Sequence, residues 1–243
     1  MNRRLLLASA LTLSFPILST LLLVAAPSDQ NSQPPKKTAV SAKTPAGTQS
    51  AELAPSLISV NGVGDIDPNK ALGSKSAPVT MEVFSDFQCP ACKQLFTTTV
   101  QRVMNDYVNT GKIYLVHRDF PLPMHAYSRV AASYSRAAAH INKDEAVEVA
   151  LFQNQEKWES DGKVAETVAS VLTPAEMKKV QAIVDSRVLE PLIDKDKQLA
   201  QGYAINQTPT TWLHTKSGQA FPVVGFVNYD VLKTFLDQLV AQK

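Results

Sequence analysis

The sequence predicts a mixed α/β domain with an inserted helical subdomain, and three observations support this fold class. Four short runs rich in β-branched and apolar residues predict strands, at residues 79–85, 113–120, 210–215 and 219–224. Helical composition fills the long interval between the second and third runs, at about residues 124–201. Of the 243 residues, 44% are hydrophobic, which is enough for one sizeable core. This order of elements predicts a central mixed β-sheet of four strands flanked by helices.

Residues 1–26 predict an export signal. Arg3 and Arg4 precede an uncharged apolar run over residues 5–26, as in a secretory signal. A run of about 20 apolar residues can also span a bilayer, and Pro27 is unfavourable directly after a cleavage site. The sequence therefore leaves open a cleaved signal peptide and a retained signal anchor. In both cases the rest of the chain is expected to be exported, in a periplasmic or extracytoplasmic location.

The segment after the signal predicts a linker and then the folded domain. Residues 27–55 are rich in Pro, Ser, Thr, Gln and Lys, which predicts a disordered linker. The domain is expected over residues 56–243. Near its start, Leu57–Val60 predicts a short edge strand, and Asn61–Pro78 is rich in turn residues.

A strand–helix–strand unit is predicted around the only two cysteines of the chain. Val79–Ser85 predicts a buried strand, and a helix is expected to start at the cysteines and run to about Asn109. Ile113–Phe120 predicts the next strand.

The helical subdomain is expected to contain several helices. His125–Ile141 and Asp144–Gln155 have helical composition. Thr173 and Glu176 form a capping box, which predicts the start of a further helix. Gly202 predicts the end of the last helix in this region.

The C-terminal segment predicts a hairpin and a final helix. Thr210–Thr215 and Gln219–Val224 flank a turn that contains Gly218. Tyr229–Gln242 has apolar residues at helical spacing. This helix is expected to pack on the sheet.

The two cysteines, Cys89 and Cys92, lie in the stretch FSDFQCPAC. A disulfide that served only as a staple would remove little chain entropy over so short a loop. A zinc site needs about four ligands, and none of the four histidines has the H-x(3–5)-H spacing; they are His117, His125, His140 and His214. These histidines are expected on the surface or on helix faces. A redox pair is therefore favoured, with no bound metal or cofactor.

The position of the pair relative to the predicted helix favours redox chemistry. Cys89 follows a strand and precedes Pro90, a residue favoured at the first helical position, so Cys89 is expected to be the N-cap. The partial positive charge of a helix N-terminus lowers the pKa of a cysteine from about 8.5 to roughly 3.5–7.5. Cys92 lies one turn further on. The sequence thus predicts an exposed nucleophile and a more buried resolving thiol.

Separated blocks of this sequence resemble one known family. FSDFQCPAC, HRDFPLPMH, LFQNQEKW and QTPTTW followed by VVGFVNYDVL are similar to the DsbA-like branch of the thioredoxin superfamily, from about Val79 to the C-terminus. The resemblance implies a thioredoxin-like fold with a helical insertion. It also implies that Cys89 is the nucleophilic cysteine and Cys92 the resolving one.

The same resemblance implies supporting residues around the pair. Pro209 occupies the place of a cis-proline, and Thr208 and Pro209 are expected to face the cysteines and to offer backbone groups to a substrate peptide. Pro90 and Ala91, the residues between the cysteines, complete the predicted support of the active site.

Two departures from the family pattern bear on the chemistry. Many relatives carry a buried acidic residue where this chain has Val83. The neighbouring Glu82 is expected on the opposite face of the strand, as an exposed or salt-bridged residue. The strongest oxidants of the family have histidine where this chain has Ala91, so a less oxidising pair is expected.

The predicted function is that of an exported thiol–disulfide oxidoreductase that forms, reduces or reshuffles disulfides in cysteine-containing exported proteins. It needs a membrane or soluble redox partner to reset the pair. The alternative is a non-catalytic thioredoxin-like binding module for unfolded peptides or a membrane partner. The net charge of +2 and scattered basic residues predict no nucleic-acid partner. A monomer is expected, soluble after cleavage or tethered to the membrane by residues 5–26.

Overall fold

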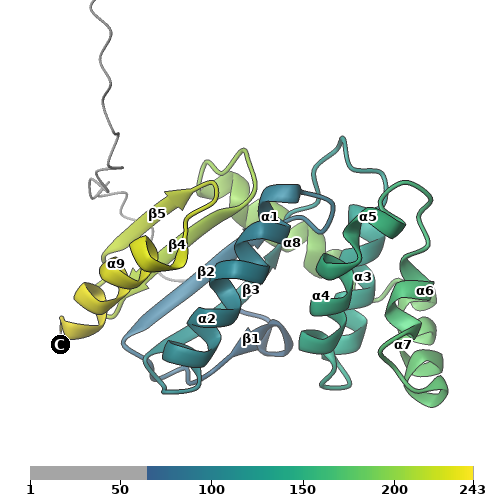
Figure 1. Ribbon diagram of the computed structural model, residues 1–243, viewed down its shortest axis with the longest axis horizontal. Helices are drawn as coiled ribbons and strands as arrows, with labels where there is room; N and C mark the ends of the chain where they lie inside the picture. The colour runs from purple at the N-terminus through teal and green to yellow at the C-terminus, as the bar shows by residue number, and fades with distance from the viewer. Residues whose placement is uncertain (1–64, 243) are drawn as a thin grey trace, which may run out of the picture. The chain divides into compact units, whose positions relative to one another are not determined.

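The computed structural model describes residues 65–242, which contain a five-stranded mixed sheet with helices around it (Figure 1). The strand order is β1-β3-β2-β4-β5. The strands are β1 (Ala71–Leu72), β2 (Val79–Ser85), β3 (Ile113–Asp119), β4 (Thr210–Thr215) and β5 (Ala220–Val224). The predicted signal or anchor, the linker and the strand at Leu57–Val60 lie outside the described residues.

Strand β2 forms the centre of the sheet. It pairs in parallel with β3 and antiparallel with β4, so that Val83 lies opposite both His117 and Thr211. The four predicted strands are confirmed, and β4 and β5 form the expected hairpin.

The fifth strand, β1, corrects the prediction of four. It pairs antiparallel with β3 in a segment expected to hold only turns. Gly73, with a φ of 90°, allows this close approach. A Cβ atom there would lie 2.7 Å from the carbonyl oxygen of Ile113 on β3.

The helix after β2 is continuous but not uniform. It comprises α1 (Pro90–Leu95), the π-helical turn η2 (Phe96–Val100), α2 (Gln101–Val103) and a second π-helical turn, η3 (Met104–Val108). The predicted extent, from the cysteines to about Asn109, is therefore confirmed. This segment and α9 (Tyr229–Ala241) cover the same face of the sheet (Figure 1).

Helices also fill the predicted insertion, as Figure 1 shows beside and behind the sheet. They are α3 (Ser128–Ala139), α4 (Asp144–Gln153), α5 (Gln155–Trp158), α6 (Val164–Ala169), α7 (Pro174–Ser186) and α8 (Glu190–Gly202). The capping box of Thr173 and Glu176 and the helix end at Gly202 are confirmed. The helix expected from His125 begins only at Ser128, because backbone N–H groups of the preceding residues bind side chains beside the cysteines.

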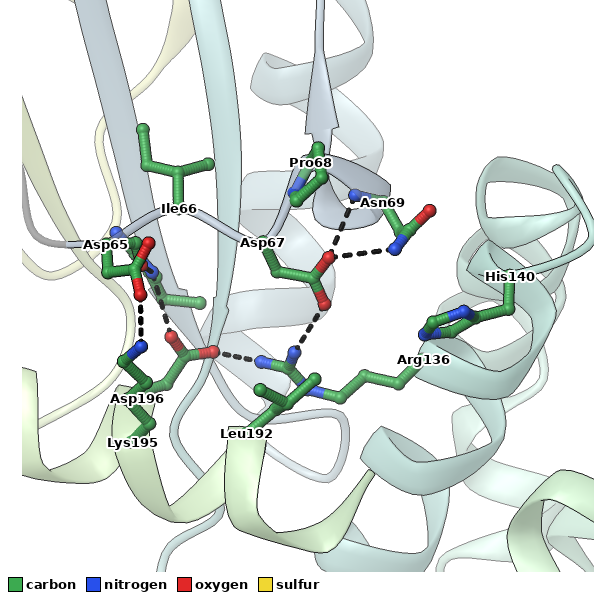
Figure 2. A pocket seen from close by; sticks show the side chains of 11 residues that line it. Asp65, Ile66, Asp67, Pro68, Asn69, Arg136, His140, Leu192, Lys195 and Asp196 are labelled. Carbon is green, nitrogen blue, oxygen red and sulfur yellow. Dashed lines mark hydrogen bonds and ion pairs between the residues drawn. The ribbon is translucent and has the colours of Figure 1, made fainter. Parts of the chain in front are cut away.

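A buried ionic cluster lies on the side of the sheet covered by α8. Arg136 contacts Asp67, Asp119 and Asp196, and Arg118 contacts Asp196 at 3.0 Å. Figure 2 shows Arg136 between Asp67 and Asp196, in the wall of a cavity of about 260 Å³. Charges removed from water need partners of this kind, so the cluster ties α3, α8 and the residues before β1 together.

Candidate active site

The two cysteines lie where strand β2 leads through a short loop into helix α1. Cys89 is the N-cap of α1, with extended backbone angles of φ −77° and ψ 120°, and Pro90 occupies the first turn. Proline fits there because the first N–H groups of a helix have no partner within the helix. The predicted N-cap is therefore confirmed, and Cys92 lies one turn into the helix.

Both cysteines are covered. Cys92 is 1% exposed and Cys89 is 8% exposed. The expected difference between them is present, but the prediction of an exposed nucleophile is wrong in degree. Cys89 is covered because it packs in the same apolar cluster as Phe87 and Cys92 and its thiol lies 3.5 Å from the Thr208 carbonyl oxygen.

The surroundings separate the pKa values of the two thiols. A hydrogen bond from the Cys92 thiol lowers the pKa of Cys89 to about 5, against the opposing effect of burial. The Thr208 hydroxyl and the backbone N–H groups of Ala91 and Cys92 add to the lowering. Burial, together with the interaction with Cys89, raises the pKa of Cys92 well above its ordinary value. Cys89 is therefore a thiolate at neutral pH and Cys92 a thiol.

The structure brings Thr208 and Pro209 to the cysteines. The peptide bond between them is cis, as the family resemblance implied. The carbonyl oxygen of Thr208 faces the Cys89 thiol, and the carbonyl oxygen of Pro209 accepts a hydrogen bond from Gly225 at 2.8 Å. The hydroxyl of Thr208 is buried beside the Cys89 sulfur and is the group of this residue that helps to lower the pKa of Cys89.

Pro90 and Ala91 contribute in different ways. Pro90 is exposed and sets the start of the helix. Ala91 is half-buried and directs its backbone N–H at the Cys89 sulfur. Its methyl group supplies no donor for the thiolate.

Glu82 lies on the opposite face of the sheet from the cysteines. Its neighbour Val83 packs in the same apolar cluster as Cys89 and Cys92. Glu82 itself is fully buried, with its carboxylate 2.6 Å from Arg118 and 2.8 Å from His214. The prediction of a salt-bridged strand residue on the opposite face is confirmed.

The expected positions of the histidines, on the surface or on helix faces, are wrong for His117 and His214, which lie on strands β3 and β4, and His125 is only partly exposed. His117 lies 2.6 Å from Glu148, His125 lies 2.9 Å from Asp86, and His214 pairs with Glu82. Each meets a buried carboxylate that spacing along the chain does not reveal. His140 is exposed, as expected.

Three further residues join the loop that carries the cysteines to the helical insertion. Asp86, Gln88 and Gln155 all make hydrogen bonds between this loop and the helical insertion. Sequence reasoning left Asp86 and Gln88 without a role and did not single out Gln155. Their presence in the blocks FSDFQCPAC and LFQNQEKW was the available signal.

Residues 65–242 contain neither a cluster of metal-binding side chains nor a helix that could span a membrane. No group of three or more His, Cys, Asp or Glu side chains within this part of the chain is placed to hold a metal ion. No helix in the same range is both long and apolar enough to cross a membrane.

Comparison with known proteins now identifies the family. Residues 67–219 match the family model described as Thioredoxin, which is more than half of the chain. The chain belongs to the thioredoxin family. Disulfide bond formation protein D of Bacillus subtilis (strain 168) is 24% identical over 186 residues, covering 74% of this chain and 80% of that protein. A probable disulfide bond formation protein D of Bacillus cereus is 25% identical over 151 residues, covering 60% and 69%.

Solved structures of similar proteins share the fold. The crystal structure of oxidised BdbD from Bacillus subtilis matches with a TM-score of 0.59 and 23% identity, over 70% of this chain and 92% of that chain. Alpha-DsbA1 from Wolbachia pipientis matches with a TM-score of 0.59 and 21% identity, over 71% and 91%. These structures confirm the predicted thioredoxin-like fold class. Together with the family match and the relatives named for disulfide bond formation, they support the predicted enzyme class, a DsbA-like thiol:disulfide oxidoreductase.

Proposed function

We propose that this protein forms disulfides in extracytoplasmic proteins by exchange at the Cys89–Cys92 pair. The observation that carries the proposal is the position of Cys89 at the helix start, with a pKa lowered to about 5, beside a buried Cys92 whose pKa is raised. A thiolate stabilised in this way favours the reduced form of the pair and therefore makes the disulfide form an oxidant.

The reaction begins with the pair in its disulfide form. A substrate thiolate attacks the Cys89 sulfur, the Cys89–Cys92 bond breaks, and Cys92 leaves and takes up a proton. The second substrate thiolate then attacks the substrate sulfur of the mixed disulfide, and Cys89 leaves as a thiolate. Two electrons pass from the substrate to the pair, and the low pKa of Cys89 makes it a good leaving group in this second step.

The direction of transfer is supported by two independent features. The lowered pKa of Cys89 lies between the values of about 7 for thioredoxin and about 3.5 for DsbA, which suits an oxidant of intermediate strength. The relatives from Bacillus are named for disulfide bond formation. Position 91 is alanine and not histidine, which fits an oxidant of intermediate strength.

Partners and location follow from the same proposal. The substrates are exported proteins with free cysteines, and a membrane or soluble redox partner reoxidises the pair. The protein acts as a monomer outside the cytoplasm, either released by cleavage or tethered by residues 5–26. Protection of the domain from a protease added to spheroplasts or protoplasts, in which only the cytoplasmic membrane remains, would contradict the export of the protein.

A direct test uses the oxidised protein and a reduced peptide that carries two cysteines. The wild-type protein should convert about one equivalent of peptide to the disulfide form, and the Cys89→Ser variant should convert none. Peptide oxidation that persists in Cys89→Ser would contradict the assignment of Cys89. Peptide binding that is unchanged when both cysteines are replaced, together with no oxidation by the wild type, would favour the binding-module alternative.

A further inference from the structure

The carboxylate of Asp86 is a buried junction between the cysteine loop and the helical insertion. It is 1% exposed and accepts hydrogen bonds from the Gln88 backbone at 2.7 Å, from the Leu122 backbone at 2.7 Å and from the Ser128 hydroxyl at 2.6 Å. The ring of His125 lies 2.9 Å from the same carboxylate. These four partners occupy the acceptor sites of the carboxylate, so the group is suited to hold the loop and the insertion together.

The main chain of Asp86 contacts both cysteines. Its N–H donates to the Cys92 sulfur at 3.5 Å, and its carbonyl oxygen accepts from the Cys89 backbone N–H at 3.1 Å. Asp86 thus contacts the insertion through its side chain and positions both cysteines through its main chain.

Two glutamines extend the same contact along the loop. The side chain of Gln88 accepts from the Tyr127 backbone at 2.6 Å and donates to the Glu159 carbonyl oxygen at 3.1 Å. Gln155 donates to the carbonyl oxygens of Phe87 and Cys89, at 2.6 and 3.2 Å. Each residue between the end of β2 and the start of α1 therefore makes a hydrogen bond to a residue of the insertion.

We propose that the helical insertion sets the redox equilibrium of the Cys89–Cys92 pair, with Asp86 as the positioning residue through which it acts. The proposal rests on the proposed function and adds a role for the insertion within it. Asp86 does not react; it fixes the loop so that the Cys89 sulfur faces the donors at the start of α1 and the Cys92 sulfur faces the Asp86 N–H. The Cys92 thiol contributes most to the lowered pKa of Cys89, and the backbone donors at the start of α1 add to it.

Loss of the carboxylate removes this restraint for a defined physical reason. In Asp86→Ala the Leu122 N–H and the Ser128 hydroxyl lose their acceptor in a buried place, and such groups move to find water or another partner. The loop then relaxes, and the Cys89 thiolate loses part of its stabilisation. One lost hydrogen bond of typical strength is worth about a tenfold change in the equilibrium between the reduced and oxidised pair.

The experiment compares matched variants of the protein by equilibration with glutathione and by thiolate absorbance against pH. Asp86→Ala should shift the glutathione equilibrium about tenfold toward the disulfide form, which corresponds to about 30 mV, and should raise the pKa of Cys89. Asp86→Asn, which keeps one acceptor oxygen, should recover part of the shift. Gln155→Leu should shift the equilibrium in the same direction by a smaller factor and serves as the test if Asp86→Ala does not fold.

The control is Glu148→Gln. Glu148 is also a buried carboxylate that joins the insertion to other elements, through Lys70 and His117, but it does not contact the cysteine loop. It should lower stability and leave the glutathione equilibrium within about twofold of the wild type. An equally unchanged equilibrium in Asp86→Ala or Gln155→Leu, or an equal shift in Glu148→Gln, would overturn the proposal. A wild-type pair that forms no reversible disulfide would instead overturn the proposed function.

Discussion

Glu82 and Arg118 form an ion pair inside the protein, on the face of the sheet that points away from the cysteines. The Arg118 Nε and the carboxylate lie 2.6 Å apart, and both side chains are almost fully buried. The acidic residue nearest in sequence to the family's buried acid thus has a structural partner and no contact with the redox pair.

Replacing Glu82 should lower the stability of the protein and leave the reactivity of Cys89 unchanged. Glu82→Gln breaks the charge pairing with Arg118, and breaking a buried pair costs about 3–5 kcal/mol of unfolding free energy. The pH profile of Cys89 alkylation should stay unchanged, as measured by thiolate absorbance or iodoacetamide reactivity. A shift of the Cys89 midpoint by one pH unit or more would show that Glu82 is coupled to the pair after all.

The reactivity of Cys89 should titrate far below that of an ordinary cysteine. The rate of alkylation is expected to rise with a midpoint near pH 5, because the thiolate is the nucleophile. Cys92 should stay unreactive at neutral pH. A single midpoint above pH 8 for both thiols would contradict the separated pKa values.

The same lowered pKa predicts how pH affects the stability of the reduced protein. The folded-state pKa of Cys89 is below its unfolded value of about 9, so its contribution to stability is fully present above pH 9 and is lost as the pH falls through 5. Between these limits the reduced form should gain stability over the disulfide form as the pH rises. Urea unfolding of both forms at pH 4 and pH 7 measures the unfolding free energy of the reduced form minus that of the disulfide form. A value that does not increase from pH 4 to pH 7 would rule this linkage out.

The residue between Pro90 and Cys92 offers a way to change the redox equilibrium of the two cysteines. Ala91→His should lower the pKa of Cys89 further, because a protonated imidazole near the thiolate favours its charged form. The glutathione equilibrium should move toward the reduced pair by about tenfold per unit of pKa. Ala91→Gln has a side chain of similar length without the charge and should show much less of the shift. Equal effects in the two variants would refute a charge effect.

Local sequence signals predicted the parts of this fold that local chemistry determines. The capping box at Thr173, the N-cap at Cys89 and the helix end at Gly202 each depend on a few neighbouring residues, and each is confirmed. The alternation of side chains along β2 also placed Glu82 and Val83 on the correct faces.

Features that depend on distant partners were not predictable in the same way. The helix expected from His125 starts late because Leu122 and Tyr127 donate their backbone N–H groups to Asp86 and Gln88, residues more than thirty positions earlier. His125 itself meets Asp86 across the same gap. Composition and spacing carry no signal for such pairs.

The reduction potential of the Cys89–Cys92 pair, measured by equilibration with glutathione at pH 7, tests the central claim most directly. A thiolate with a pKa near 5 predicts a potential less negative than about −200 mV, on the oxidising side of the range that extends from about −270 mV for thioredoxin to about −120 mV for DsbA. A potential near about −270 mV, or a pair that forms no reversible disulfide, would contradict a role in forming disulfides.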